Sequence, residues 1–314
     1  MAEMTDVALQ YLAHNYDYLF LKGRLEKAID MRTDEGVLVV GSSHSLNGID
    51  ESLFPDLINC SMHSQDIYYD YACARYVIDQ AKGSFRTCMV VFGYYIAYQD
   101  LSMSTVVRNS MVAGVYYPIL QDAHNWDVPF ERNRWEFTDL NLDVDTKIQI
   151  DRITMEWSQT NPYYSIIRNR TPFFRVDGNR SWNELTEEEK HLCASERAGS
   201  GKQGHGRLLK NVTTYKENIE IYKELIRYLV IHDVKPVVII PPFTGLYNAY
   251  TPKGMIDGAL ELINSTDDTV EFVNFNESDM FEDSDFIDTD HLNENGSKKM
   301  TEILFNLFGE QKDK

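Results

Sequence analysis

The sequence is poor in several features that would assign a protein to a class at once. Its 30 Lys and Arg residues are outnumbered by 49 Asp and Glu, which gives a formal charge of -19. A surface of that sign repels nucleic-acid phosphates and anionic lipids, so we expect neither as a partner. No apolar run reaches the length of a transmembrane helix, and residues 1–17 lack a basic start followed by an apolar stretch. We therefore expect no membrane insertion and a cytoplasmic chain.

Cysteine, histidine and glycine are present without the spacings that hold ligands. The four cysteines form no C-x-x-C pair and the eight histidines show no zinc-like spacing, so we expect buried free thiols and no metal. The segment Gly199–Lys202 resembles a phosphate loop, but no strand precedes it, Glu196 stands where the first glycine is needed, and Gln203 follows the lysine. We interpret this segment as a flexible loop and expect no cofactor.

What the sequence does contain is a series of short aliphatic runs that end at turn residues. Hydrophobic residues make up 43% of the 314, enough for a large buried core. Each run is typical of a strand that is buried on both faces, and helical spacing separates the runs. They predict an α/β fold, a flavodoxin-like three-layer sandwich with a five-stranded parallel sheet. The predicted strands cover residues 37–43, 57–60, 88–93, 236–242 and 270–275.

Apolar residues at three- and four-residue intervals predict the helices around this sheet. The first stretch indicates one or two helices on the outside of the sheet, and Asn293 is a good N-cap for the last helix. After Tyr95 the alternation of strands and helices breaks until residue 206. We interpret residues 96–206 as a mostly helical insertion between the third and fourth strands of a single domain, 1–314. It forms either a lid or substrate wall, or a packing elaboration remote from any site. The predicted helices cover residues 4–32, 65–82, 146–159, 211–232, 255–264 and 294–308.

Polar residues follow the first and last predicted strands. Ser43 ends the first strand, and Asp288 and His291 lie between the fifth strand and the last helix. The carboxyl ends of parallel strands meet at one edge of the sheet, so these residues are expected to come together. A hydroxyl, an imidazole that takes its proton and a carboxylate that orients the imidazole are the requirements of nucleophilic acyl transfer. The alternatives are a turn serine and a surface histidine that precedes a helix.

The neighbouring polar residues are less favourable candidates. Spacing favours Asp288 over Asp290 as the partner of His291, because Asp290 is adjacent to the histidine and is expected to point away. His44 adjoins Ser43 and is poorly placed to be its base, so we expect it to support the site or to face solvent. His63 and His205 could enter the site, although isolated histidines seldom bind or catalyse.

These residues carry a family resemblance. The run Val37–Ser43, with the later segment Asp288–Gly296, resembles the SGNH (GDSL) hydrolase superfamily, which places its serine after the first strand and an Asp-x-x-His pair before the last helix. The Gly-Ser-Ser opening resembles the branch that includes the D-alanyl-lipoteichoic acid transfer protein and SGNH-like proteins of bacterial polysaccharide clusters. The similarity covers residues 34–95 and 211–308, and leaves the insertion unexplained.

The resemblance implies a role for each of these residues. Ser43 would be the nucleophile, and its own backbone N–H would be one donor of the oxyanion hole. The family glycine that supplies a second donor is replaced by Ser61, and the asparagine that supplies a third by Tyr94 or Tyr95, of which we choose Tyr95. Loss of one oxyanion donor typically costs about 10²-fold to 10³-fold in rate.

The resemblance also implies a function. We expect a serine esterase or acyltransferase that forms an acyl-enzyme on Ser43 with an ester of a carbohydrate or glycan-like substrate. The competing hypothesis is a catalytically impaired SGNH-fold protein that binds or assembles components in glycan biosynthesis. A flavin or nucleotide binder is a weaker third hypothesis. Hydrolysis or transfer, and the oligomeric state, stay open.

Overall fold

The protein is described by a computed structural model that covers residues 2–127, 142–159, 180–266 and 268–309. The chain divides into two compact units, Met1–Asp30 with Leu101–Phe173, and Met31–Asp100 with Phe174–Lys314. These boundaries differ from the predicted insertion at 96–206. Residues 96–100 and 180–206 belong to the unit with the sheet, whereas the N-terminal helix belongs to the other unit.

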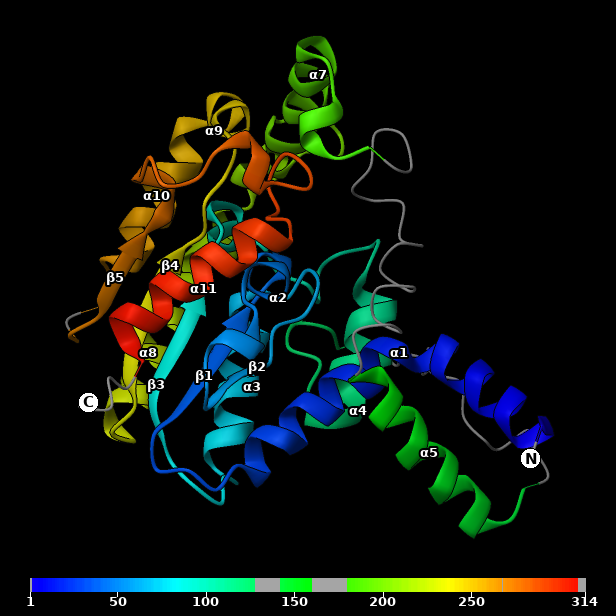
Figure 1. Ribbon diagram of the computed structural model, residues 1–314. Coiled ribbons are helices and arrows are strands. Elements are labelled where there is room, and N and C mark those ends of the chain that lie inside the picture. The colour runs from blue at the N-terminus through cyan, green and yellow to red at the C-terminus, as the bar shows by residue number, and fades with distance from the viewer. Residues whose placement is uncertain (1, 128–141, 160–179, 267, 310–314) are drawn as a thin grey trace. The chain divides into compact units, whose positions relative to one another are not determined.

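The sheet has five parallel strands in the order β2-β1-β3-β4-β5, as in flavodoxin-like folds. This confirms the predicted fold class. The inner strands are continuous aliphatic runs because helices cover both faces (Figure 1). At the edge, β5 is partly exposed. The strands are β1 (Gly36–Gly41), β2 (Leu57–Asn59), β3 (Phe85–Val91), β4 (Lys235–Ile240) and β5 (Glu271–Asn274).

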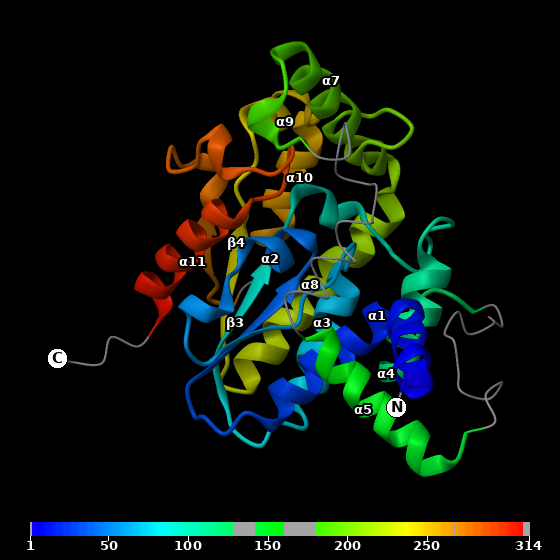
Figure 2. The same cartoon turned by 45° about the vertical axis from the view of Figure 1, so that its right-hand side comes forward.

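Helices form a layer on each side of the sheet. On one side α3 (Ile67–Ile78) packs on β1 and β3 and contacts α8 (Val212–Ile231), which packs on β4. On the other side α2 (Ser43–Gly48) contacts α11 (Glu294–Phe308), as Figure 2 shows from a second direction. Strand residues such as Val37 and Val39 pack in the core beneath α11. The result is the expected three-layer arrangement.

A glycine sets the position of the candidate nucleophile. Gly41 has a φ of +153°, and a Cβ there would lie 2.6 Å from Ser45 Oγ and 2.8 Å from the Val91 carbonyl oxygen. The chain therefore turns at Gly41, two residues before the predicted end of the strand at Ser43. Ser42 is the N-cap of α2, and Ser43 is the first residue of that helix instead of the last residue of the strand.

Much of the connection between β3 and β4 packs beside the sheet. Just after β3 lies η2 (Tyr94–Tyr98), and later come η6 (Trp182–Glu184), α7 (Glu187–Ala198) and η7 (His205–Lys210). The backbone N–H of Trp182 donates to the Ile287 carbonyl at 3.1 Å, and Lys190 pairs with Asp283 at 2.9 Å. These two contacts tie η6 and α7 to the segment that precedes α11. Gly199–Lys202 lies in the loop between α7 and η7.

The other unit is helical. The helix α1 (Ala2–Asp30) is interrupted at Asn15, where φ is -117° and ψ is 19°, so it consists of two helical pieces, as one of the predicted alternatives had it. It packs against α5 (Val144–Ser158), and Tyr11 donates to Asp151 across that contact at 3.0 Å. The sequence predicts that this helix packs on the outside of the sheet; in the structure α1 belongs to the helical unit, where α5 packs against it.

The described residues contain no helix long and apolar enough to cross a membrane. All four cysteines are free, as expected; Cys60, Cys73 and Cys88 are buried and Cys193 is half-buried. The remaining elements are η1 (Glu51–Leu53), η3 (Asn109–Tyr116), α4 (Tyr117–Leu120), α9 (Gly245–Tyr250), α10 (Lys253–Ile263), η8 (Phe275–Glu277) and η9 (Asp283–Asp285).

Candidate active site

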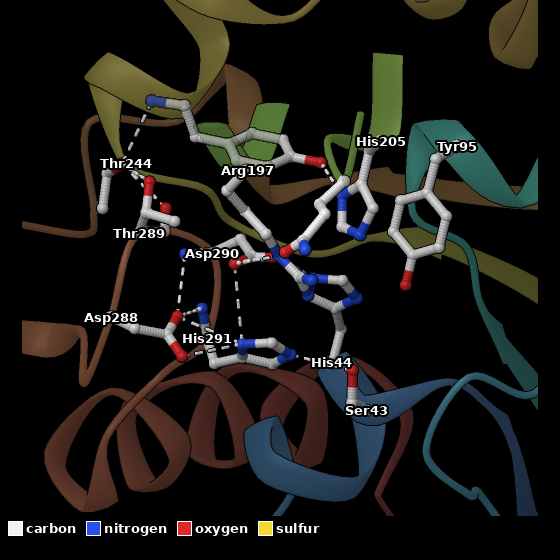
Figure 3. A network of polar contacts seen from close by, with 12 residues as sticks. Ser43, His44, Tyr95, Arg197, His205, Thr244, Asp288, Thr289, Asp290 and His291 are labelled. Atoms are coloured by element: carbon white, nitrogen blue, oxygen red, sulfur yellow. Dashed lines mark hydrogen bonds and ion pairs between the residues drawn. The ribbon is translucent and has the colours of Figure 1, made fainter. Parts of the chain in front are cut away.

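Ser43 and His291 meet at the carboxyl edge of the sheet (Figure 3). Ser43 Oγ lies 2.8 Å from His291 Nε2, although the two residues are 248 positions apart in the sequence. Ser43 is 4% exposed and His291 is 1% exposed. The predicted nucleophile and base are therefore within hydrogen-bond reach of each other in a buried position.

Asp288 holds His291 from the other side. Its two carboxylate oxygens lie 3.1 and 3.0 Å from His291 Nδ1. One of them also accepts the backbone N–H groups of Asp290 at 3.0 Å and His291 at 2.8 Å, so a tight turn fixes the carboxylate against the ring. Because an ionised carboxylate only accepts, Nδ1 carries the proton and Nε2 is left to accept from Ser43.

The loop that carries this pair is anchored to its surroundings. An isolated antiparallel bridge joins Phe286 to Leu292. Thr244, which follows β4, donates its hydroxyl proton to the Thr289 carbonyl at 2.8 Å. Asn293 caps α11 as predicted, accepting from the N–H groups of residues 295 and 296. The triad is thus held by the end of β4 and by the start of the last helix.

His44 lies directly against the triad histidine. Its ring is stacked on the His291 ring with 4.7 Å between centroids and 11° between planes. His44 Nε2 is 3.3 Å from Asp290 Oδ2, and Nδ1 is 3.1 Å from Ser42 Oγ. At 3% exposure His44 does not face solvent, so the first of the two expected roles, support of the site, is the one that its position favours.

Asp290 points into the site, contrary to our expectation that it would point away. Its side chain is 1% exposed and accepts from Arg197 Nε at 3.0 and 3.1 Å, and it lies 3.6 Å from His291 Nδ1. The tight turn at Asp288 directs the side chains of Asp290 and His291 inward together. Burial raises the pKa of Asp290, but Arg197 and the nearby imidazoles outweigh burial and hold that pKa well below its usual range.

Tyr95 reaches the serines from η2. Its hydroxyl donates to Ser42 Oγ at 3.4 Å and also interacts with Ser43. Its ring is stacked on His205 with 3.8 Å between centroids, and His205 Nδ1 is 2.6 Å from the Tyr247 hydroxyl. Burial raises the pKa of Tyr95 to about 12, so at neutral pH the hydroxyl keeps its proton and can donate.

The other oxyanion candidates are engaged elsewhere. The Ser61 N–H donates to Asn59 Oδ1 at 3.2 Å, and its hydroxyl accepts from Ser45 at 2.7 Å. The Tyr94 hydroxyl accepts from Asn276 at 2.7 Å. Of the two tyrosines that could replace the family asparagine, Tyr95 is therefore the one whose hydroxyl contacts the serines. His63 is half-buried in the turn after β2.

Three possible metal ligands come together in this site. Donor atoms of His44, Asp290 and His291 lie within 4.8 Å of one another. Arg197, however, already occupies the Asp290 carboxylate, and the outward nitrogen of His291 faces Ser43. A cation would have to displace an arginine and break the serine contact, so we assign no metal here.

Sequence reasoning missed Arg197. It lies on α7, a helix that we did not predict from the sequence, 93 residues before Asp290, and no local spacing connects the two. The only signal was the Asp290 carboxylate itself, which needs a cation once it is recognised as buried.

The sequence matches no protein-family model and no curated protein.

Proposed function

We propose that the protein is an SGNH-like serine esterase or acyltransferase that acts through an acyl-enzyme on Ser43. The observation that carries this proposal is the continuous chain from Ser43 through His291 to Asp288, with distances of 2.8 and 3.0 Å. A turn serine or a surface histidine would not need this arrangement, because neither requires a buried imidazole held at both nitrogens.

The chemistry follows from the proton positions. Ser43 Oγ attacks the ester carbonyl while His291 Nε2 takes its proton, and Asp288 stabilises the imidazolium that forms. The alcohol leaves with the proton from His291, and the acyl group stays on Ser43. Water or an acceptor hydroxyl then attacks this ester with His291 again as the base, which regenerates Ser43.

The oxyanion of the tetrahedral intermediate needs donors near Ser43. The Ser43 backbone N–H stands at the first position of α2, where a helix offers no internal acceptor. The neutral Tyr95 hydroxyl is the second donor in this proposal, in place of the family asparagine. Ser61 stays a prediction, because its N–H would first have to leave Asn59.

The substrate class rests on the resemblance described above. An ester of a carbohydrate or glycan-like molecule fits the branch that the Gly-Ser-Ser opening and the Asp-x-x-His segment resemble. Hydrolysis and transfer share the Ser43 acyl-enzyme, so the test below addresses that shared intermediate.

The test is labelling with a fluorophosphonate, which reacts with activated serines, followed by intact mass. Wild-type protein should gain a single adduct, Ser43→Ala should gain none, and Ser45→Ala, which changes another serine of the same helix, should keep the adduct. An unlabelled wild type under conditions that label a known serine hydrolase would contradict the proposal.

A second candidate function is a catalytically impaired binding or assembly protein with the SGNH fold. The contact that favours it is the Ser61 N–H bound to Asn59, which removes one family oxyanion donor, together with the absence of the family asparagine. An unlabelled wild type would support this candidate.

A further inference from the structure

The site contains a second chain with the same three residue types. Asp290 contacts His44 Nε2 at 3.3 Å, and His44 Nδ1 contacts Ser42 Oγ at 3.1 Å. It runs beside the chain of Asp288, His291 and Ser43, with the two imidazoles stacked. Figure 3 shows the two rings together, with Arg197 at the far end of the second chain.

The direction of each proton in the second chain follows from its ends. Asp290 is ionised beside Arg197, so it can only accept, and His44 must donate to it from Nε2. A neutral His44 then has only a lone pair on Nδ1, and the single proton of Ser42 must be given to it. Ser42 Oγ is left as an acceptor, and Tyr95 is its donor.

A second nucleophile is the obvious alternative for Ser42, and two observations oppose it. Ser42 is fully buried, whereas Ser43 is 4% exposed. Burial also lowers the pKa of His44 to about 4, despite its hydrogen bond to Asp290, which makes it a weak base at neutral pH. The arginine that neutralises Asp290 removes the charge that would otherwise help His44 to accept a proton.

We propose that Arg197, Asp290, His44 and Ser42 form a positioning chain that holds the Tyr95 hydroxyl as a hydrogen-bond donor beside Ser43. This inference rests on the proposed function. With its proton directed at the two serine oxygens, Tyr95 has only to shift from the long contact of 3.4 Å with Ser42 to the oxyanion as charge develops. The four residues act through Tyr95 and do not touch the substrate.

A double-mutant cycle tests whether Ser42 acts through Tyr95. The measured quantity is the second-order rate of fluorophosphonate labelling for wild type, Ser42→Ala, Tyr95→Phe and the double variant. We expect Tyr95→Phe to slow labelling by about 10²-fold and Ser42→Ala by about 10-fold. The double variant should be no slower than Tyr95→Phe. Multiplying effects would overturn the proposal, because they would show that Ser42 acts independently of Tyr95.

Substitutions of Arg197 provide a second test, with a control on the same helix. Arg197→Gln should slow labelling in the wild-type background and leave it unchanged in the Tyr95→Phe background, and Arg197→Lys should restore most of the rate. Lys190→Gln, which removes another cation of α7 paired to the same segment through Asp283, should have no effect. Equal slowing by Arg197→Gln in both backgrounds would show a structural role and overturn the proposal.

A measurement that does not depend on catalysis is the tautomer of His44, read from its imidazole ¹⁵N shifts at neutral pH. The proposal requires a neutral ring with the proton on Nε2, and a proton on Nδ1 would overturn it. If wild-type protein gains no adduct, the proposed function fails and this tautomer decides the positioning chain by itself.

Discussion

Two imidazoles lie parallel in this site, each between a serine and an aspartate, and the difference between them lies in the surroundings of the aspartates. The Asp288 side chain is 12% exposed and is balanced by two backbone N–H groups. Asp290 is 1% exposed and is balanced by a full positive charge on Arg197. The comparison teaches that residue identity does not make a catalytic base. The histidine whose carboxylate is not paired with an arginine, His291, is the one that we propose as the base.

The sharpest way to test this difference is to remove each imidazole in turn. His291→Gln should slow fluorophosphonate labelling by about 10⁶-fold, leaving no detectable adduct, because Ser43 loses its base. His44→Gln should leave an adduct that forms about 10-fold to 10²-fold more slowly, since Ser43 keeps its base and the position of Tyr95 is disturbed. Intact mass over time measures both. Equal losses would mean that the two histidines share one role.

Replacement of Asp288 should have the larger effect on the labelling rate, and replacement of Asp290 should have the larger effect on stability. Asp288→Asn should slow labelling by about 10⁴-fold, because an amide no longer fixes the proton on Nδ1 of His291. Asp290→Asn should slow it far less but lower the free energy of unfolding by about 2 to 3 kcal/mol. That cost is below the figure for a fully buried pair because the Arg197 side chain is 25% exposed.

Labelling rates and urea unfolding of both variants measure these effects. A larger loss of stability in Asp288→Asn than in Asp290→Asn would contradict the assignment of the structural charge to Asp290.

At low pH, protonation of His44 should lower the free energy of unfolding. The pKa of His44 is lowered from 6.5 to about 4, first by burial. The unfolded chain therefore binds a proton at a higher pH than the folded one, so stability is complete above pH 6.5 and is lost as the pH falls towards 4. The loss from His44 is about 3 kcal/mol.

Urea unfolding at several pH values between 4 and 7 measures this dependence. Burial also lowers the pKa of His205, which adds a loss in the same direction in both proteins. The difference between wild type and His44→Gln isolates the part due to His44. Parallel curves for the two proteins would show that His44 titrates normally.

Of the paired variants, the two tyrosine substitutions should show the smallest difference in labelling rate. Tyr95→Phe should slow labelling by about 10²-fold through loss of an oxyanion donor. Tyr94→Phe serves as the matched control, because the Tyr94 hydroxyl is bound to Asn276 and should leave the rate within about 2-fold of wild type. Sensitivity to Tyr94 and not to Tyr95 would reverse our choice between them.

Sequence reasoning succeeded where the pattern is local or where the fold makes a distant pair unavoidable. Aliphatic runs predicted all five strands, and Asn293 predicted the start of α11. The pairing of Ser43 with His291 could be predicted because parallel strands bring their carboxyl ends to one edge. The end of the first strand was predicted two residues too late, because the position of the turn depends on the backbone angles of Gly41.

The rest depends on contacts that leave no local trace. Arg197 comes to Asp290 from another helix, and its own neighbours are ordinary helix residues. The Leu, Tyr and Ala residues of α1 predict a helix that packs on another element, but their spacing does not identify α5 as that element. In both cases the sequence shows that a partner is needed but does not identify that partner.

The stacking of the His44 and His291 rings disfavours a positive charge on both rings at once. With ring centroids 4.7 Å apart, a positive charge on His291 opposes protonation of His44, and His291 is among the causes of the lowered His44 pKa. His44 is therefore a poor second site for a proton held by His291. In the proposed reaction, the proton that His291 takes from Ser43 is therefore not passed to His44 and leaves with the departing alcohol.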